Sequence, residues 1–160
     1  MGLDLTKVSL PPRGPRTVVK PVDLSRRFAG YMASVMQLPA LMAGRSPSAR
    51  ARTLIQFIKD WNYWVDSRPA MLDGPPPPDS DPFDLACIAA IVHALTARDG
   101  VDVPEWVHRY RADPPRLFTG LGVDSGYGQL IVAEAPPVCA HHGVYFEAEM
   151  LDRGAPTPGE

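Results

Sequence analysis

The chain has 160 residues, of which 45% are hydrophobic and 21% charged, values that are ordinary for a globular protein with one core. It contains no apolar run near the ~20 residues that a membrane-spanning helix requires, and its N-terminus lacks the apolar stretch of a secretory signal. Two cysteines, Cys87 and Cys139, do not make a disulfide framework. We therefore expect a cytoplasmic protein with no membrane partner, and the 19 prolines predict short elements.

Charged residues are distributed unevenly along the chain. Residues 1–52 hold nine Lys and Arg against two Asp, so residues 53–160 hold the remaining seven basic and sixteen acidic residues. Such a division is typical of a basic arm that binds phosphates or an acidic partner, or of two halves that attract each other. Residues 1–22 are also rich in proline, which predicts a flexible basic arm. We expect a single helical domain over 23–153 and a disordered tail over 154–160.

The first two predicted helices are bounded by proline. Asp23 is a suitable N-cap for a helix that continues through Leu38 and that Pro39 is expected to end. Ser46, followed by proline, is a strong start for a second helix that runs to Val65. The apolar stripe of this second helix also contains Leu54, Ile58 and Trp61.

The middle of the chain repeats the pattern of a capping residue followed by proline. Residues 67–82 are expected to form a loop whose four consecutive prolines act as a stiff spacer rather than as a ligand for an aromatic groove. Asp81 then caps a helix with one apolar face that ends near Gly100. Pro104 begins a shorter helix, the third that starts at a proline, which Pro114 stops.

The last third of the sequence predicts smaller elements. The glycine-rich residues 119–128 indicate a loop, and residues 127–134 have helical composition. Residues 143–146 are prone to form a short strand, and residues 148–151 predict a final helical turn. The fold class is therefore mainly α: a compact helical bundle of five or six helices with at most a small β element and a flexible Pro-rich N-terminal arm.

No local pattern indicates catalysis. The sequence contains no nucleophile elbow, phosphate-binding loop or dinucleotide fingerprint. Cys139, His141 and His142 are the one local cluster of metal-capable side chains, whereas zinc usually takes four such ligands. The distant residues that could complete a set, if the fold brought them there by chance, are His93, His108 and Cys87. We therefore predict no enzyme activity, no cofactor and no metal site, and interpret the cluster as a solvent-facing histidine pair beside a buried Cys139.

Aromatic and basic residues are concentrated at the end of the second predicted helix, at Trp61, Tyr63, Trp64 and Arg68. Such residues are enriched at the energetic centres of protein interfaces. Trp61 lies on the apolar stripe and is expected in the core. Trp64 is displaced from that stripe by three positions, so it fits the core and a partner surface equally well.

The basic first third offers an alternative, which is nucleic-acid binding. Its candidate contacts are Arg26, Arg27, Arg45, Arg50 and Arg52. Two helices joined by a short connection invite comparison with a helix-turn-helix motif. However, the connection from Pro39 to Ser46 is longer than the usual turn, and the second helix is apolar along its middle. DNA binding is therefore the alternative reading and not the favoured one.

Several motifs follow one another in a recognisable order, namely Phe57–Asp60, Arg68–Leu72, Asp84–Ala90, Val103–Val107, Glu134–Pro136 and His142–Phe146. In this order they resemble a family of uncharacterised actinobacterial proteins that are often encoded beside nucleotidyltransferase-like toxins and are suspected to be their antitoxins. The resemblance covers roughly residues 50–153. Many relatives carry a helix-turn-helix before this block, which is not clear here.

The resemblance implies a non-enzymatic protein-binding module that neutralises a cognate toxin protein. The aromatic and basic residues then become candidate partner contacts: Trp64, Arg68 and Trp106 in the helical body, with Arg13 and Arg16 on the arm. Because the second predicted helix is apolar on more than one face, a homodimer is a further candidate assembly.

Overall fold

The computed structural model describes residues 32–155. The predicted arm over 1–22, most of the helix expected after Asp23 and the end of the predicted tail lie outside these residues. Arg13 and Arg16 also lie outside them, as do Arg26 and Arg27.

Helices dominate the described chain, so the prediction of a mainly α fold is confirmed. The α-helices are α2 (Leu38–Met42), α3 (Pro47–Tyr63), α4 (Arg68–Met71), α5 (Pro82–Asp99), α6 (Gly126–Glu134) and α7 (Val138–His142). The 3-10 helices are η3 (Val65–Ser67), η4 (Glu105–Arg109) and η5 (Ala148–Asp152). Two strands, β2 (Arg116–Leu117) and β3 (Val144–Tyr145), pair in parallel and form a small β element.

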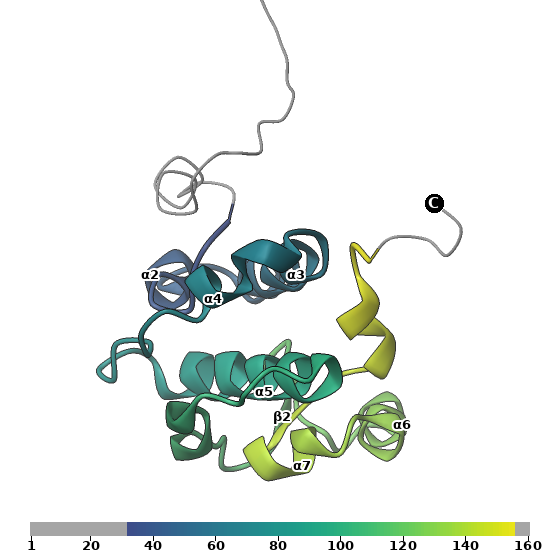
Figure 1. The fold of residues 1–160 in the computed structure, drawn as a ribbon. Helices are drawn as coiled ribbons and strands as arrows, with labels where there is room; N and C mark the ends of the chain where they lie inside the picture. Colours follow the sequence, from purple (N-terminus) through teal and green to yellow (C-terminus); the bar gives the residue numbers. More distant parts are fainter. Residues whose placement is uncertain (1–31, 156–160) are drawn as a thin grey trace, which may run out of the picture.

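Helix α5 forms the centre of the molecule. It lies between a layer containing α2, α3 and α4 and a second layer containing β2, α6 and α7 (Figure 1). The side chain of Asp81 accepts a hydrogen bond from the Asp84 backbone N–H, and Gly100 closes the helix in the left-handed conformation, as the capping signals predicted. Because α5 is covered on both sides, its buried residues extend around the helix instead of occupying one face.

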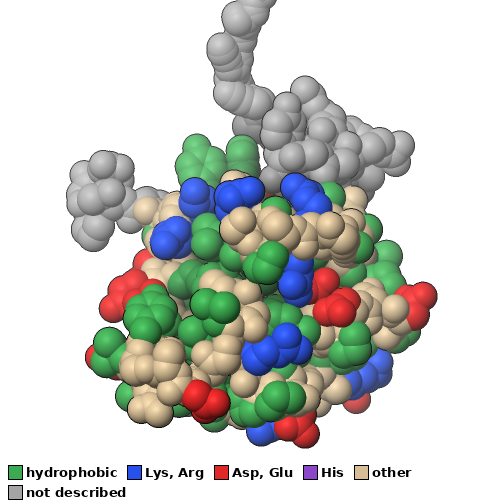
Figure 2. Space-filling view, turned by 180° about the vertical axis from the view of Figure 1, so that it is seen from behind, with side chains coloured by type: hydrophobic (Ala, Val, Ile, Leu, Met, Phe, Trp, Pro, Cys, Tyr) green, Lys and Arg blue, Asp and Glu red, His purple; other side chains and the backbone are tan. Residues whose placement is uncertain are grey.

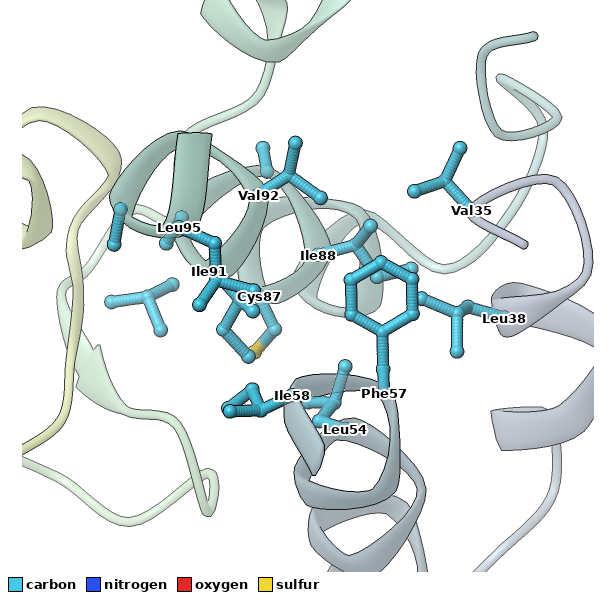
Figure 3. Packing of buried hydrophobic residues seen from close by; sticks show 14 of the residues in the cluster. Val35, Leu38, Leu54, Phe57, Ile58, Cys87, Ile88, Ile91, Val92 and Leu95 are labelled. Carbon is cyan, nitrogen blue, oxygen red and sulfur yellow. The ribbon is translucent and has the colours of Figure 1, made fainter. Parts of the chain in front are cut away.

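Helix α3 packs its apolar stripe against α5. The Ser46 hydroxyl accepts from the Ala49 N–H, which confirms the predicted start of this helix. Figure 3 shows Leu54, Phe57 and Ile58 of α3 pointing toward the apolar side chains of α5. Trp61 is fully buried, as expected from its place on the stripe. The helix ends at Tyr63, so Val65 leaves the stripe and is 54% exposed, contrary to the prediction.

Proline has a different role at position 39 from the one predicted. The sequence predicts that Pro39 ends a helix, but α2 begins at Leu38 and Pro39 lies in its first turn. The first turn tolerates proline because the N–H groups there have no partner within the helix. Residues 32–37 are not helical, so this part of the helix expected from Asp23 to Leu38 is not formed.

The second layer contains elements that the sequence does not predict. Strand β3 lies within the predicted strand segment, but its partner β2 and the short helix α7 were not predicted. The parallel register joins Arg116 to Val144 and Leu117 to Tyr145, which are distant in sequence. This pairing places α7 directly against α5 (Figure 1). None of the described helices combines the length and apolar composition that crossing a membrane requires.

Candidate functional site

An exposed aromatic edge, formed by Tyr63, Trp64 and Val65, lies where α3 gives way to η3. The exposed fractions of these side chains are 65%, 39% and 54%, respectively. The rings of Tyr63 and Trp64 meet edge to face, with centroids 4.8 Å apart. These residues follow directly on the buried Trp61 and Asn62, so the chain passes from core to surface within one helical turn.

The base of the aromatic edge is fixed by polar contacts to α5. The indole N–H of Trp61 donates to Asp99 over 2.7 Å. The Arg68 guanidinium lies 4.8 Å above the Trp61 ring and donates through Nε to the Trp61 carbonyl oxygen at 2.9 Å. Hydrogen bonds from Arg98, with a further one from Trp61, hold the pKa of Asp99 below its usual range. The backbone that carries the edge is therefore anchored to the core.

The predicted partner residues of the helical body occupy different environments. Trp64 belongs to the aromatic edge. Arg68 contacts Trp61 at the base of this edge and forms an ion pair with Asp99 at 3.5 Å. Trp106, on η4, is only 6% exposed, and its indole nitrogen is buried without a hydrogen-bond partner in the structure. Because Trp106 is enclosed by the core, the prediction that it contacts a partner does not fit its position.

The described arginines of the nucleic-acid alternative do not form one free basic surface. Arg45 and Arg52 are exposed, and Arg45 donates to the carbonyl oxygen of Leu41. Arg50 instead forms an ion pair with the buried Asp84 and lies near the Phe83 ring. Figure 2 shows several Lys and Arg side chains along the upper part of one face, toward the α2–α4 layer, and others in its middle and lower parts, where acidic side chains also lie.

A second group of exposed apolar side chains surrounds α6. Leu121, Tyr127 and Leu130 are 64%, 61% and 54% exposed. The helix itself buries only Gly128 and Ile131. This surface is comparable to the aromatic edge in exposure but lies in the other layer of the molecule, so it provides a natural control for experiments on the edge.

The four histidines of the sequence meet in one histidine cluster. Its members are His93 on α5, His108 on η4, and His141 and His142 on α7. The prediction of a solvent-facing pair is half wrong, because His141 is exposed but His142 is completely buried. Cys139 is buried, as expected, and burial raises the pKa of its thiol to about 12.

Hydrogen bonds orient the inner half of the histidine cluster. His142 Nδ1 lies 2.8 Å from the Tyr110 carbonyl oxygen, and since a carbonyl only accepts, this nitrogen carries a proton. His142 Nε2 lies 2.9 Å from His93 Nδ1, so in the neutral rings His93 donates to His142. Burial lowers the pKa of His142 to about 4, which keeps its ring neutral at pH 7. Within residues 32–155, no group of three or more His, Cys, Asp or Glu side chains could hold a metal ion.

The sequence contained only a partial signal for this cluster. The adjacent pair at positions 141 and 142 was visible, but His93 and His108 belong to separate elements. Only the packing of α7 and η4 against α5 joins them, and α7 was not predicted.

No protein-family model matches this chain, and neither does any curated protein or any solved structure. The family resemblance inferred from the ordered motifs therefore stays a prediction. Function has to be inferred from the described side chains and from the charge of the sequence.

Proposed function

We propose that the chain is a non-enzymatic protein-binding module that neutralises a cognate toxin of the nucleotidyltransferase class. The observation that carries the proposal is the aromatic edge, where Tyr63, Trp64 and Val65 stand exposed on an anchored backbone. Tyrosine and tryptophan supply a large contact area with few rotatable bonds, and they dominate the energetics of many interfaces.

Anchoring of the edge favours tight binding. Ordering a mobile segment on association costs free energy, and each immobilised side chain adds to that cost. Here the contacts of Trp61 and Arg68 with Asp99 hold the edge before any partner arrives. Most of the area that the aromatic rings bury on binding therefore contributes to affinity.

Charge supports the same kind of partner. Residues 53–160 hold seven basic and sixteen acidic residues, so this part of the chain is strongly acidic. An enzyme that handles nucleotides presents a basic cleft to its substrate, and an acidic protein is attracted to such a cleft. Electrostatic steering accelerates this association, and contacts of the aromatic edge slow dissociation.

The test is co-expression of the chain with the product of its neighbouring gene, followed by co-purification and a growth assay. We expect the wild-type chain to form a complex and relieve toxicity. Tyr63→Ala with Trp64→Ala should weaken the complex by at least ~10-fold, because aromatic hot spots contribute 2 kcal/mol or more.

The matched control is Tyr127→Ala with Leu130→Ala, which removes similarly exposed apolar groups from α6. This variant should bind and protect like the wild-type chain. A wild-type chain that neither binds nor protects would refute the toxin-neutralising function. Full binding by the edge variant together with loss of binding by the α6 variant would refute the role of the aromatic edge.

DNA binding is a second candidate, favoured by the exposure of Arg45 and Arg52 at the start of α3. A regulator of this kind would bind its own promoter with an affinity that falls steeply as salt rises. Arg45→Ala with Arg52→Ala should then reduce both the affinity and the salt dependence. Absence of DNA retention by the wild-type chain at ~50 mM salt would exclude this candidate.

A further inference from the structure

The histidine cluster lies at the junction of three elements. His93 comes from α5, His108 from η4, and His141 and His142 from α7, and together they are all four histidines of the sequence. Figure 1 shows α7 on the side of α5 that faces away from α3. The cluster is therefore placed where the second layer of the molecule meets the central helix, away from the aromatic edge.

The four rings are close enough for charges on them to repel each other. Ring centroids lie 5.1 Å apart for His93 and His142, 5.3 Å for His93 and His108, and 4.8 Å for His141 and His142. His141 lies 5.6 Å from both His93 and His108. These separations are shorter than the Debye length of ~8 Å in physiological salt, so screening is incomplete. Each proton that the cluster gains therefore makes the next proton harder to add.

A hydrogen bond between the two inner rings joins α7 to α5. His142 Nδ1 donates to the Tyr110 carbonyl oxygen at 2.8 Å, which leaves the lone pair on Nε2. His93 Nδ1 donates to this Nε2 at 2.9 Å. A first added proton can bind the other ring nitrogen of His93 and leave this bond intact. A second added proton can bind the pair only at His142 Nε2, where it removes the acceptor and breaks the bond.

The closed structure excludes protons from the inner rings. Burial, the largest cause, and the other three histidines lower the pKa of His142 to about 4, although its hydrogen bond to Tyr110 opposes the shift. Burial and the neighbouring histidines also lower the pKa of His93. A histidine in water titrates near pH 6.5. Between that pH and about pH 4, a detached α7 binds protons that the closed structure does not, so acid favours the detached state.

The carboxylates on the elements around the cluster do not offset this charge. They are Asp84 and Asp99 on α5, Glu105 on η4 and Asp113 in the loop after η4. Asp84 pairs with Arg50, and Asp99 pairs with Arg98. Glu105 and Asp113 are exposed to solvent, and β3 contains no carboxylate. Within residues 32–155, no carboxylate forms an ion pair with a histidine.

The other ionisable groups at this junction are positive or neutral in acid. Arg109, at the end of η4, is exposed. Arg111 donates to the carbonyl oxygen of His141 at 2.7 Å, which fixes a positive charge next to α7. Tyr145 on β3 and Cys139 on α7 are neutral when protonated, so neither supplies a negative charge. Protons added to the cluster therefore repel each other without compensation from the described side chains.

We propose that the histidine cluster is an acid-sensitive switch that releases α7 from α5 when both inner rings are protonated. At neutral pH the hydrogen bond from His93 to His142 holds the two helices together. In acid, His142 no longer accepts this bond, and repulsion among the charged rings drives α7 into solvent. The core between α3 and α5 lies on the other side of α5, so it stays folded during the release (Figure 1). The switch is separate from the aromatic edge and needs no partner protein.

The test is amide hydrogen exchange of the full chain, followed by NMR at pH 7 and pH 5. The reporters are the N–H groups of Ala112 and Arg116, which donate to the carbonyl oxygens of His142 and Gly143 at 2.8 and 3.0 Å. Their protection factors, which compare each exchange rate with that of an unstructured peptide at the same pH, should fall by at least ~10-fold on acidification. Unchanged protection at both reporters would overturn the proposal.

The internal control is the set of amides in residues 86–92 of α5, which exchange when the core itself opens. A local readout is needed because the buried Asp60, whose pKa is raised to about 6, makes the opposite contribution to global stability. Protection of the α5 amides should change by less than that of the two reporters. An equal fall at both places would show global unfolding and would also overturn the switch.

Two variants test the roles of the rings. His142→Gln keeps an acceptor for His93 but does not titrate, so the reporters should lose most of their pH dependence. Wild-type pH dependence in this folded variant would refute the inner pair as the switch. The double variant His108→Gln with His141→Gln changes only exposed side chains, which keeps the test independent of a core substitution. It should raise the pKa of His142, read from its ring signals, and reduce the pH response roughly 3-fold. No change in either quantity would refute the role of repulsion.

Discussion

The carboxyl group of Asp60 is buried, and only one of its two oxygens has a hydrogen-bond partner in the structure. The residue is 7% exposed; its Oδ1 accepts from Gln56 at 3.0 Å, and its Oδ2 is buried with no partner in the structure. Burial raises the pKa of Asp60 to about 6. Between roughly pH 3.9, the ordinary value for an unfolded chain, and pH 6, the folded protein retains a proton that the unfolded chain has lost. Stability therefore falls as pH rises through this window and stays reduced above it.

We expect Asp60→Asn to raise the free energy of unfolding at pH 8 by up to about 3 kcal/mol, since a shift of one pKa unit corresponds to about 1.4 kcal/mol. Near pH 4 the gain should largely disappear, because Asp60 is then protonated in the folded protein. Urea unfolding at both pH values measures the difference. Asp66→Asn, at an exposed position, should change stability by no more than ~0.5 kcal/mol. An equal gain at both pH values would contradict the account.

At the scale of elements, the connection between α7 and β3 depends on Gly143. This residue closes α7 at φ 64° and ψ 21°, in the left-handed region. A Cβ atom added there would overlap the carbonyl oxygen of Ala112. The N–H of Ala112 in turn donates to the His142 carbonyl oxygen at 2.8 Å, so Ala112 also holds the backbone of His142 in place.

We expect Gly143→Ala to cost more than about 2 kcal/mol of unfolding free energy, because it combines left-handed strain with an overlap against backbone. Gly100→Ala is the matched control. Gly100 also ends a helix, at φ 69°, but an added Cβ there meets no atom within 4 Å. Strain alone should then cost about 1 kcal/mol. Equal losses for the two variants in urea unfolding would show that the contact with Ala112 is unimportant.

Local chemistry explains which elements the sequence predicted. Ser46 and Asp81 each precede a proline and cap a helix through their own side chains, so both signals lie within four residues. The pairing of β2 with β3 and the histidine cluster depend on contacts between distant segments, for which the sequence has no local signal. Proline was misleading at Pro39, since the same residue can stop one helix or occupy the first turn of another.

In the candidate site, too, local patterns predicted some positions, and contacts between distant segments decided the others. Periodicity placed Trp61 in the core, and the offset of Trp64 from the apolar stripe left its surface position open. The prediction of Trp106 as a partner contact rests on its residue type, although tryptophan is mostly buried in folded proteins. Nothing local distinguishes a tryptophan in a short 3-10 helix on the surface from one that packs into the core.

At the scale of the whole molecule, Arg98 joins segments from distant parts of the chain. It donates to the Asn62 side-chain oxygen and to the Leu151 carbonyl oxygen, both at 2.6 Å, and it pairs with Asp99 at 2.8 Å. Asn62 completes the junction by donating to the carbonyl oxygens of Leu151 and Arg153, each at 2.8 Å. The junction therefore fixes η5 against α3 and α5, and through Asp99 it reaches the base of the aromatic edge.

We expect Arg98→Met to lower the free energy of unfolding by about 2–4 kcal/mol, because it leaves the buried Asn62 side-chain oxygen without its donor and removes one of the two donors to the Leu151 carbonyl oxygen. The loss should appear first in η5, as faster hydrogen exchange over residues 148–153 than over α5. Arg52→Met removes an exposed arginine from α3 and should cost no more than ~0.5 kcal/mol. If exchange in η5 stays as slow as in the wild-type chain, η5 is held by its apolar contacts alone. If exchange accelerates in η5 and partner binding also weakens, the junction couples η5 to the aromatic edge.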